Sequence, residues 1–448
     1  MQQASKCVQR SLNLSWQYAL APYAALHERA IMCRLMKLHA TIIGKCLLVT
    51  GSVYQRGRLS MSVYLDNSAT TRVRDEVLEA MQPYLTDKWG NPSSIHRLGR
   101  QARAAIEAAR QQIADLIGAQ PAEIHFTPAG TYSNNVALLG RARFVEENKL
   151  GRHLITSCIE HSSGLGPSKH LAARGWKVTY LHVDKEGFVD LDELRASLSD
   201  ETSMISLMYA NNEVGTVQPI EEIARIAQER NIFYHTDAVQ AAGKIKLDVT
   251  KLPVQTMSLS GHKFHAPKGI GILYIRKDAP ILPIIFGGGQ EKGVFPGTEN
   301  LASIVGIGKA AELAAQNLEE NSKKLRAIQE VMIARLTREE CVKLTGAKNL
   351  DKRIPGHVSV IVHGTVGEQL VNDADFKGIC ISSVSACSSS GVDPSHVLSC
   401  IGFPREEVMG SARITAGCFN TLEECEKAAD VLAQLFVKRA AKNTVAAV

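Results

Sequence analysis

Strand and helix patterns alternate along the chain from residue 62 onward, and this alternation constrains the fold more than any other feature. Short β-rich runs such as "TSMISLMYA" and "IFYHTD" are separated by helical patterns such as "IEEIARIAQERN". Such alternation predicts an α/β fold with a mostly parallel sheet and helices on both faces. Ligands bind at the carboxyl ends of the strands in these sheets. We therefore expect functional residues in the loops after the strands.

The pattern changes after "PGTEN". A helical run, which a break can divide, covers about 301–336, and "HVSVIVHG" then predicts a strand. The last helix is "TLEECEKAADVLAQLFVKRAA", with Thr421 and Glu424 as a capping box at its start. We expect a large domain over 62–310 and a smaller α+β domain over 311–440.

Residues 1–60 differ in composition from the rest of the chain. They contain eight Lys or Arg residues but a single acid, Glu28, which is typical of an organellar transit peptide. Alternatively they are a non-functional extension, because Met61 stands just before the first convincing strand, "SVYLDNSATT". We expect this segment to lie outside the fold. The expected location is cytoplasmic, or mitochondrial or plastid if the segment is a transit peptide.

Charge and cysteine usage argue against several classes of protein. The net charge of +6 is mild and is not gathered in one block, so a nucleic-acid partner is not expected. The apolar run "ATIIGKCLLVTGSVY" is too short to span a bilayer, and we expect no membrane partner. The ten cysteines form no CxxC pair and no zinc-spaced cluster, which predicts no metal and a reducing compartment.

The stretch "SLSGHKFHAPKGIGILYI" places Lys263 in a polar turn between two β-rich runs. A lysine at such a junction is desolvated, which lowers its pKa and makes its amine a nucleophile. Ser260 and His262 flank this lysine, and both could donate hydrogen bonds to one anionic group of a ligand bound there.

Other loops carry groups that complement this lysine. In "FTPAGTYSNN" a strand gives way to Gly130 and Thr131 at a helix start, which is either an anion site or an ordinary helix cap. His161 follows "HLITSCI", and Asp237 ends "IFYHTD" three residues before Gln240. A lysine, an anion-binding helix start, an imidazole and a carboxylate together suit pyridoxal phosphate, which needs a Schiff-base lysine and an anion beside its ring nitrogen.

A serine-rich loop, "GICISSVSACSSSGVDPSHVL", presents Cys387. Because serine lacks bulk, the thiol can be exposed and mobile, and it can attack a sulfur atom on a bound amino acid. The alternative, a free buried cysteine, fits Cys380 or Cys400 better because their neighbours are apolar.

Two further groups could bind a carboxylate. Arg413 in "GSARITAG" offers a bidentate fork. Asn211 and Asn212 follow a strand, where neutral amides can bind an anion, although turns also favour asparagine.

These motifs resemble those of the cysteine desulfurases, which belong to the class V aminotransferase-like group with the pyridoxal-phosphate fold type I. The resemblance extends from about Val63 to Ala433 and rests on "YLDNSATT", "WGNPSS", "GTYSNN", "EHSS", "NNEVGTVQPI", "TDAVQAAGK", "SGHKFHAPKGIG", "GGGQEKG", "PGTEN" and "SSVSACSSSGVDPSHVL", in that order. It implies a mostly parallel seven-stranded sheet flanked by helices, with a smaller α+β C-terminal domain.

The resemblance also implies roles for the cofactor-binding residues. Lys263 would form the Schiff base, Asp237 would pair with the ring nitrogen, and Gln240 would contact the phenolic oxygen. His161 would stack on the ring and move protons. The phosphate would be held by Gly130, Thr131, Ser260 and His262.

The implied reaction converts L-cysteine to L-alanine. Asn211 and Arg413 would bind the substrate carboxylate, and Cys387 would take the sulfur as a persulfide. A sulfur-acceptor protein such as an iron–sulfur scaffold would then receive it, for iron–sulfur cluster or other sulfur-compound biosynthesis. Thr298 would reach the phosphate of a partner subunit, which implies a homodimer.

The chain departs from the family pattern at three positions. Tyr132 replaces a usual Glu, Phe295 a usual Arg, and Val384 a usual Gly. A β-branched residue disfavours positive φ, so Val384 would restrict the loop if that backbone shape is needed. The alternative functions are a selenocysteine lyase or a cystine C–S lyase of the same fold, or a non-catalytic paralogue that acts as a scaffold.

Overall fold

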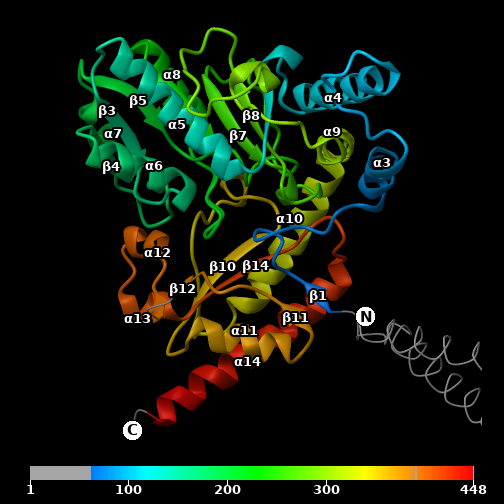
Figure 1. Ribbon diagram of the computed structural model, residues 1–448. Helices are drawn as coiled ribbons and strands as arrows, with labels where there is room; N and C mark the ends of the chain where they lie inside the picture. The colour runs from blue at the N-terminus through cyan, green and yellow to red at the C-terminus, as the bar shows by residue number, and fades with distance from the viewer. Residues whose placement is uncertain (1–61, 385, 389–390, 447–448) are drawn as a thin grey trace, which may run out of the picture. The chain divides into compact units, whose positions relative to one another are not determined.

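The computed structural model describes residues 62–384, 386–388 and 391–446, so the predictions for 1–60 lie outside the described residues. Its main feature is a seven-stranded sheet with the strand order β2-β8-β7-β6-β5-β3-β4 (Figure 1). The strands are β2 (Ile124–Thr127), β3 (His153–Ser157), β4 (Lys177–Leu181), β5 (Thr202–Ser206), β6 (Phe233–Asp237), β7 (Thr256–Ser260) and β8 (Gly271–Ile275). Strand β8 is antiparallel to both of its neighbours, and all other pairs are parallel. The predicted mostly parallel sheet is confirmed.

Helices cover both faces of this sheet because alternate strand residues are apolar on both sides. Ile155, Ile205 and Tyr234 lie in the cluster of α4 (Arg97–Ile117), α8 (Ile220–Glu229) and α9 (Leu301–Gln316). The preceding residues Leu154, Met204 and Phe233 lie in the cluster of α5 (Gly130–Glu147) and α6 (Ser162–Ala173). The remaining helices around the sheet are α3 (Asp75–Thr86) and α7 (Leu191–Ser197).

A second sheet has three strands in the order β14-β10-β9. These are β9 (Val342–Leu344), β10 (His357–Val362) and β14 (Ser411–Thr415), and all pair antiparallel. They pack in one apolar cluster with α10 (Leu318–Leu336), α11 (Gly367–Asp375) and α14 (Leu422–Ala446). The predicted helical run is therefore divided at Asn317, with α9 in the core of the large sheet and α10 in the core of the small one. The domain boundary at 310/311 stays a prediction.

The segment at the start of the described chain connects β11 and β14 to the lysine turn. Strand β1 (Val63–Tyr64) pairs in parallel with β11 (Ile379–Cys380), and Asp66 bridges to Thr415 of β14. A few residues later, the amide of Thr71 donates to the carbonyl of His262 at 2.8 Å. The motif "DNSATT" is thus held against both β14 and the turn after β7.

The capping box predicted at the start of α14 is half formed. The Glu424 amide donates to Thr421 Oγ1 at 3.2 Å, whereas the Glu424 carboxylate accepts from Asn420 instead. Helices α12 (His396–Ile401) and α13 (Arg405–Met409) follow the serine-rich loop. No helix among the described residues is both long and apolar enough to cross a bilayer.

Candidate active site

Lys263 ends the short turn η2 (Gly261–Lys263) between β7 and β8. Its Nζ donates to the carbonyl oxygens of Ser68 at 2.5 Å and Ala69 at 2.9 Å. Burial lowers the pKa of Lys263 to about 8, and the charge of Arg413 acts in the same direction. The amine is therefore desolvated and held by neutral acceptors, as the motif predicts.

Asp237 lies at the carboxyl end of β6, and its carboxylate is fixed by two donors. Asn134 Nδ2 donates to Oδ2 at 2.7 Å, and the Val239 amide donates to Oδ1 at 3.0 Å. His235 Nε2 in turn lies 3.0 Å from Asn134 Oδ1. Sequence reasoning missed Asn134. The available signal was its position four residues after Gly130, which puts both residues on one face of α5.

His161 caps the start of α6. Its Nδ1 accepts from the Ser163 amide at 3.1 Å, and Ser163 Oγ lies 2.8 Å away. Burial lowers the pKa of His161. A neutral imidazole whose Nδ1 accepts a hydrogen bond carries its proton on Nε2. Ser163 Oγ also accepts from Asn134 Nδ2 at 2.8 Å, so one amide links the histidine to Asp237.

Helix α5 begins where a strand end and the lysine turn approach closely. Its N-cap, Ala129, offers no side-chain acceptor, so the first amides of the helix have no cap. A Cβ atom on Gly130 would lie 2.8 Å from Val239 Cγ2 and 3.3 Å from Ser260 Cβ. Only glycine fits this approach, and the uncapped helix start is a ready site for an anion.

Arg413 on β14 is 7% exposed and bound on two sides. Its Nη2 lies 2.9 Å from Asp66 Oδ1, and its Nη1 donates to the Asn212 carbonyl at 3.1 Å. Its buried Nε has no hydrogen-bond partner among the described residues. An acceptor that reaches this nitrogen would satisfy a buried donor.

These groups meet in one cavity with a volume of about 340 Å³, within the range of small-ligand sites. It is lined by Gly130, Thr131, His161, Asn212, Asp237, Gln240, Ser260, His262, Lys263 and Arg413, all named from the sequence, and by Ser68, Ala69, Ala129, Ser163, Met208, Ala210 and Val239.

Two residues expected to bind the substrate or the cofactor, Asn211 and Thr298, do not line this cavity. Asn211 is fully buried, its Nδ2 donates to the Ile159 carbonyl at 3.0 Å, and its Oδ1 accepts the amides of the next turn. The next residue, Asn212, lines the cavity in its place. Thr298 is exposed in the segment before α9, and its expected role depends on a partner subunit, so it stays a prediction.

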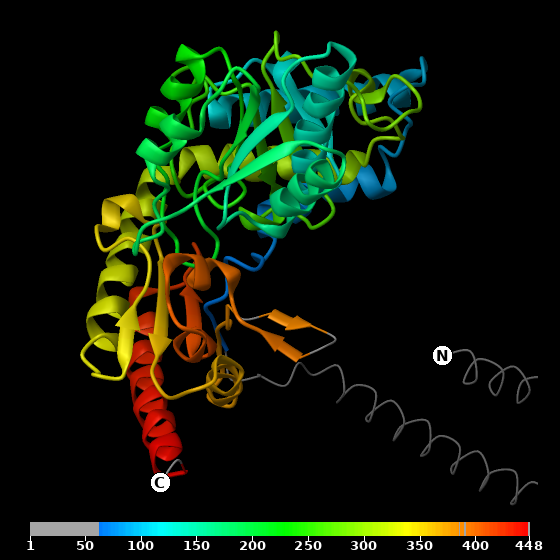
Figure 2. The same cartoon turned by 90° about the vertical axis from the view of Figure 1, so that its left-hand side faces the viewer.

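Cys387 lies in a hairpin of β12 (Ala386–Ser388) and β13 (Gly391–Asp393), opposite Val392. Figure 2 shows this hairpin extending outward from the three-stranded sheet. The side chain of Cys387 is outside the described part of the structure. Val384, at the base of the hairpin, is buried in an apolar cluster and is not among the residues with positive φ. The expected backbone restriction therefore does not arise.

The other two departures from the family pattern contact each other. The rings of Tyr132 and Phe295 lie edge to face, with centroids 5.9 Å apart and an interplanar angle of 87°. An aromatic pair thus stands where the family pattern has an acid and an arginine.

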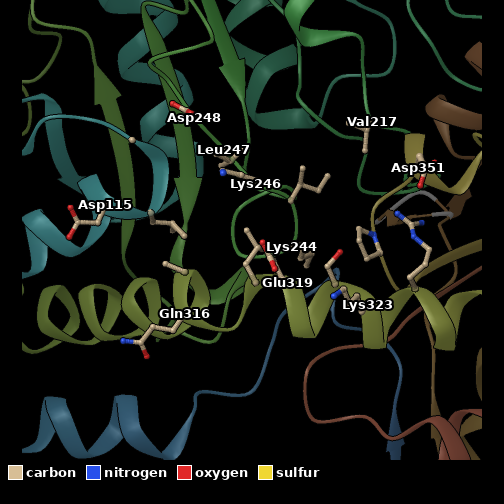
Figure 3. A pocket seen from close by; sticks show the side chains of 18 of the residues that line it. Asp115, Val217, Lys244, Lys246, Leu247, Asp248, Gln316, Glu319, Lys323 and Asp351 are labelled. Atoms are coloured by element: carbon tan, nitrogen blue, oxygen red, sulfur yellow. The ribbon is translucent and has the colours of Figure 1, made fainter.

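A larger hollow of about 1040 Å³ lies by the junction of α9 and α10 and contains none of the residues named from the sequence (Figure 3). Lys244 lines it and also connects it to the candidate site, because its Nζ donates to Gln240 Oε1 at 3.3 Å. Gln240 Nε2 then donates to the Ser68 carbonyl at 3.0 Å, the same acceptor that Lys263 uses.

Comparison with known proteins shows the family of the chain. The family model of class V aminotransferases matches residues 63–427. Cysteine desulfurase IscS of Dictyoglomus turgidum is 46% identical over 381 residues, which cover 85% of this chain and 96% of that protein. The chain belongs to the cysteine desulfurases. Cysteine desulfurase IscS of Methanosarcina thermophila is also 46% identical, over 84% of this chain and 92% of its own.

Solved structures of the family share the fold. A NifS-like protein superposes with a TM-score of 0.79 at 38% identity and covers 84% of this chain and 100% of its own. SspA in complex with cysteine gives a TM-score of 0.70 at 34% identity, over 80% of this chain and 100% of its own. Cysteine desulfurases of the class V aminotransferase family depend on pyridoxal phosphate.

Proposed function

We propose that this desulfurase uses pyridoxal phosphate in the 340 Å³ cavity to convert L-cysteine to L-alanine, with Cys387 as the sulfur acceptor. One observation carries the proposal: Lys263, with its desolvated amine, and Asp237, with its fixed carboxylate, line the same cavity.

The lining fits the cofactor. The uncapped start of α5 with Thr131, Ser260 and His262 offers donors for a phosphate. Asp237 offers the anion that keeps a pyridine nitrogen protonated. When bound, pyridoxal phosphate supplies an electron sink for the amino-acid substrate.

The protein groups position the cofactor and move protons. Lys263 would hold the cofactor covalently and carry protons on Nζ. His161 would carry a proton on Nε2, because Nδ1 already accepts a hydrogen bond. Gln240 Nε2 would donate to the phenolic oxygen of the ring, while its Oε1 is held by Lys244.

The substrate carboxylate would bind Arg413 and Asn212. The partner-free Nε of Arg413 supports this assignment, as does the place of Asn212 in the cavity wall. The C–S bond of cysteine would break and an S–S bond would form on Cys387. In the net reaction the Cys387 thiol loses one proton and the substrate carbon gains one, so the products are alanine and an enzyme persulfide.

The wider setting is proposed on the family resemblance. We propose a homodimer in which Thr298 completes the phosphate site of the partner subunit. A sulfur-acceptor protein, such as an iron–sulfur scaffold, would take the persulfide sulfur. The proposed location is the cytoplasm.

The test measures alanine and sulfide formed from L-cysteine with a thiol reductant present. Cys387→Ala is expected to abolish sulfide release and to keep the absorbance of bound cofactor, whereas Lys263→Ala is expected to lose the covalently held cofactor. Cys425→Ala, which changes a cysteine buried in the small core, is the control and should match the unmodified chain. Faster turnover of selenocysteine or cystine that does not need Cys387 would contradict the proposal.

A further inference from the structure

Two thiols meet outside the cavity. Cys158 directly follows β3 and Cys400 lies in α12, 242 positions later in the sequence. The Cys400 thiol donates to the Cys158 carbonyl at 3.4 Å, and each thiol shifts the pKa of the other. Both residues are half-buried and neither is in a disulfide.

The surroundings hold the pair together without shielding it completely. Both cysteines pack against an apolar cluster that includes Ile159, Val397 and Ile401. Among the described residues, no group of three or more His, Cys, Asp or Glu side chains could bind a metal. Because both side chains are only half-buried, the pair is a dithiol that small reagents can reach.

The two thiols differ in acidity. The interaction with the Cys158 thiol lowers the pKa of Cys400, and the charge of His182 acts in the same direction. His182 Nδ1 lies 2.8 Å from Glu193 Oε1, which raises the pKa of the imidazole and favours its cationic form. The same interaction, together with burial, raises the pKa of Cys158. Cys400 is thus the better thiolate nucleophile and Cys158 the second thiol.

We propose that Cys158 and Cys400 are a reversible redox site that forms a disulfide by exchange with a small-molecule disulfide such as oxidised glutathione. The Cys400 thiolate attacks one sulfur of glutathione disulfide, whose S–S bond breaks and releases one glutathione. Cys158 then gives up its proton and attacks the Cys400 sulfur, which releases the second glutathione. Two protein thiols are oxidised, and one glutathione disulfide is reduced to two thiols.

This bond would join the segment that carries His161 to the segment that follows the Cys387 hairpin, and its effect on activity rests on the proposed function. Cys158 precedes His161 by three residues, and α12 begins shortly after the Cys387 hairpin. The two segments already touch, since His396 Nε2 lies 2.9 Å from the Glu160 carbonyl. A covalent link there would restrict the hairpin relative to His161, and transfer of sulfur to Cys387 would slow.

The first experiment needs no activity. The full chain with Cys387→Ser is incubated with oxidised glutathione, alkylated and digested for mass spectrometry. We expect a linked peptide pair that contains Cys158 and Cys400, absent when either is also changed to Ser and retained in a Cys425→Ser control. Free thiols, or separate glutathione adducts on the two cysteines, would overturn the proposal.

The second experiment measures alanine formation after the same treatment and removal of glutathione. The unmodified chain is expected to slow about tenfold, whereas Cys400→Ser slows less because it cannot form the link. Equal slowing would overturn the coupling to the active site. Absence of alanine from the reduced, unmodified chain would instead overturn the proposed function.

Discussion

At the scale of single residues, burial sets the charges of the site. It lowers the pKa of Lys263 to about 8 and raises the pKa of Glu160, next to His161, to about 8. Near neutral pH the Glu160 carboxyl is therefore largely protonated, and it accepts hydrogen bonds from Ser157 Oγ at 2.6 Å and the Met208 amide at 3.0 Å. A neutral Glu160 adds no negative charge beside His161.

The lowered pKa of Lys263 predicts how the apoprotein captures its cofactor. The neutral amine is the reactive form, so a pKa of about 8 makes it available at lower pH than an ordinary lysine with a pKa of 10.5. The rate of covalent capture of pyridoxal phosphate, followed by absorbance, should rise about tenfold per pH unit below about pH 7 and level off above about pH 9. A rate that keeps rising through pH 10 would contradict the lowered pKa.

Lys244 is expected to act on the cofactor through Gln240. Burial lowers the pKa of Lys244 to about 7, but its amine still donates to Gln240 Oε1, which leaves Nε2 to donate to Ser68 in the cavity wall. Lys244→Met should weaken binding of pyridoxal phosphate to the apoprotein about fivefold, the value of one hydrogen bond of about 1 kcal/mol. Lys246→Met changes an exposed lysine of the same hollow and is the matched control (Figure 3). Equal weakening in both variants would rule out the link through Gln240.

At the scale of elements, the long connection from β8 to α9 is attached to α4 and to the start of α5. Glu291 in this connection pairs with Arg110 of α4 at 2.9 Å, and Phe295 packs on Tyr132 at the start of α5. Glu291 also accepts the Phe126 amide at 2.8 Å. The connection is therefore held beside the start of α5, where Thr131 lines the cavity.

The aromatic pair predicts a measurable coupling. Edge-to-face rings contribute about 1 kcal/mol beyond burial, so the double variant Tyr132→Ala/Phe295→Ala should destabilise the protein by about 1 kcal/mol less than the sum of the single variants. Free energies of unfolding from denaturant titration give the cycle. Strict additivity would contradict a stabilising contact between the two rings.

Local sequence signals predicted an element correctly where the residue that determines it is a neighbour in the chain. Helix α4 ends before Gly118, which has a φ of 71°, as a helix-ending glycine should. The capping box at Thr421 formed only in part, because the Asn420 side chain competes for Glu424. The spacing of a local motif does not show whether a third residue will form a hydrogen bond with one of its members.

At the scale of the whole molecule, the sheet and most of the cavity followed from the sequence because parallel strands bring their carboxyl ends to one edge. The sequence did not show that Asn212 rather than Asn211 lines the cavity, because this depends on the hydrogen bonds that the Asn211 side-chain amide makes to Ile159 and Glu213. Asn134 and the contact of Cys158 with Cys400 also require tertiary placement. Thr298 requires a second subunit, and the division at 310/311 stays a prediction.

The central claim is that the sulfur of L-cysteine passes to Cys387, and trapping the sulfur tests it most directly. The cofactor-loaded chain is given one equivalent of L-cysteine without reductant, alkylated at once and mapped by mass spectrometry, with alanine measured in parallel. We predict one alanine for each extra sulfur atom, with that sulfur on Cys387. Alanine released in equal amount with the sulfur on another cysteine, or on none, would contradict the claim.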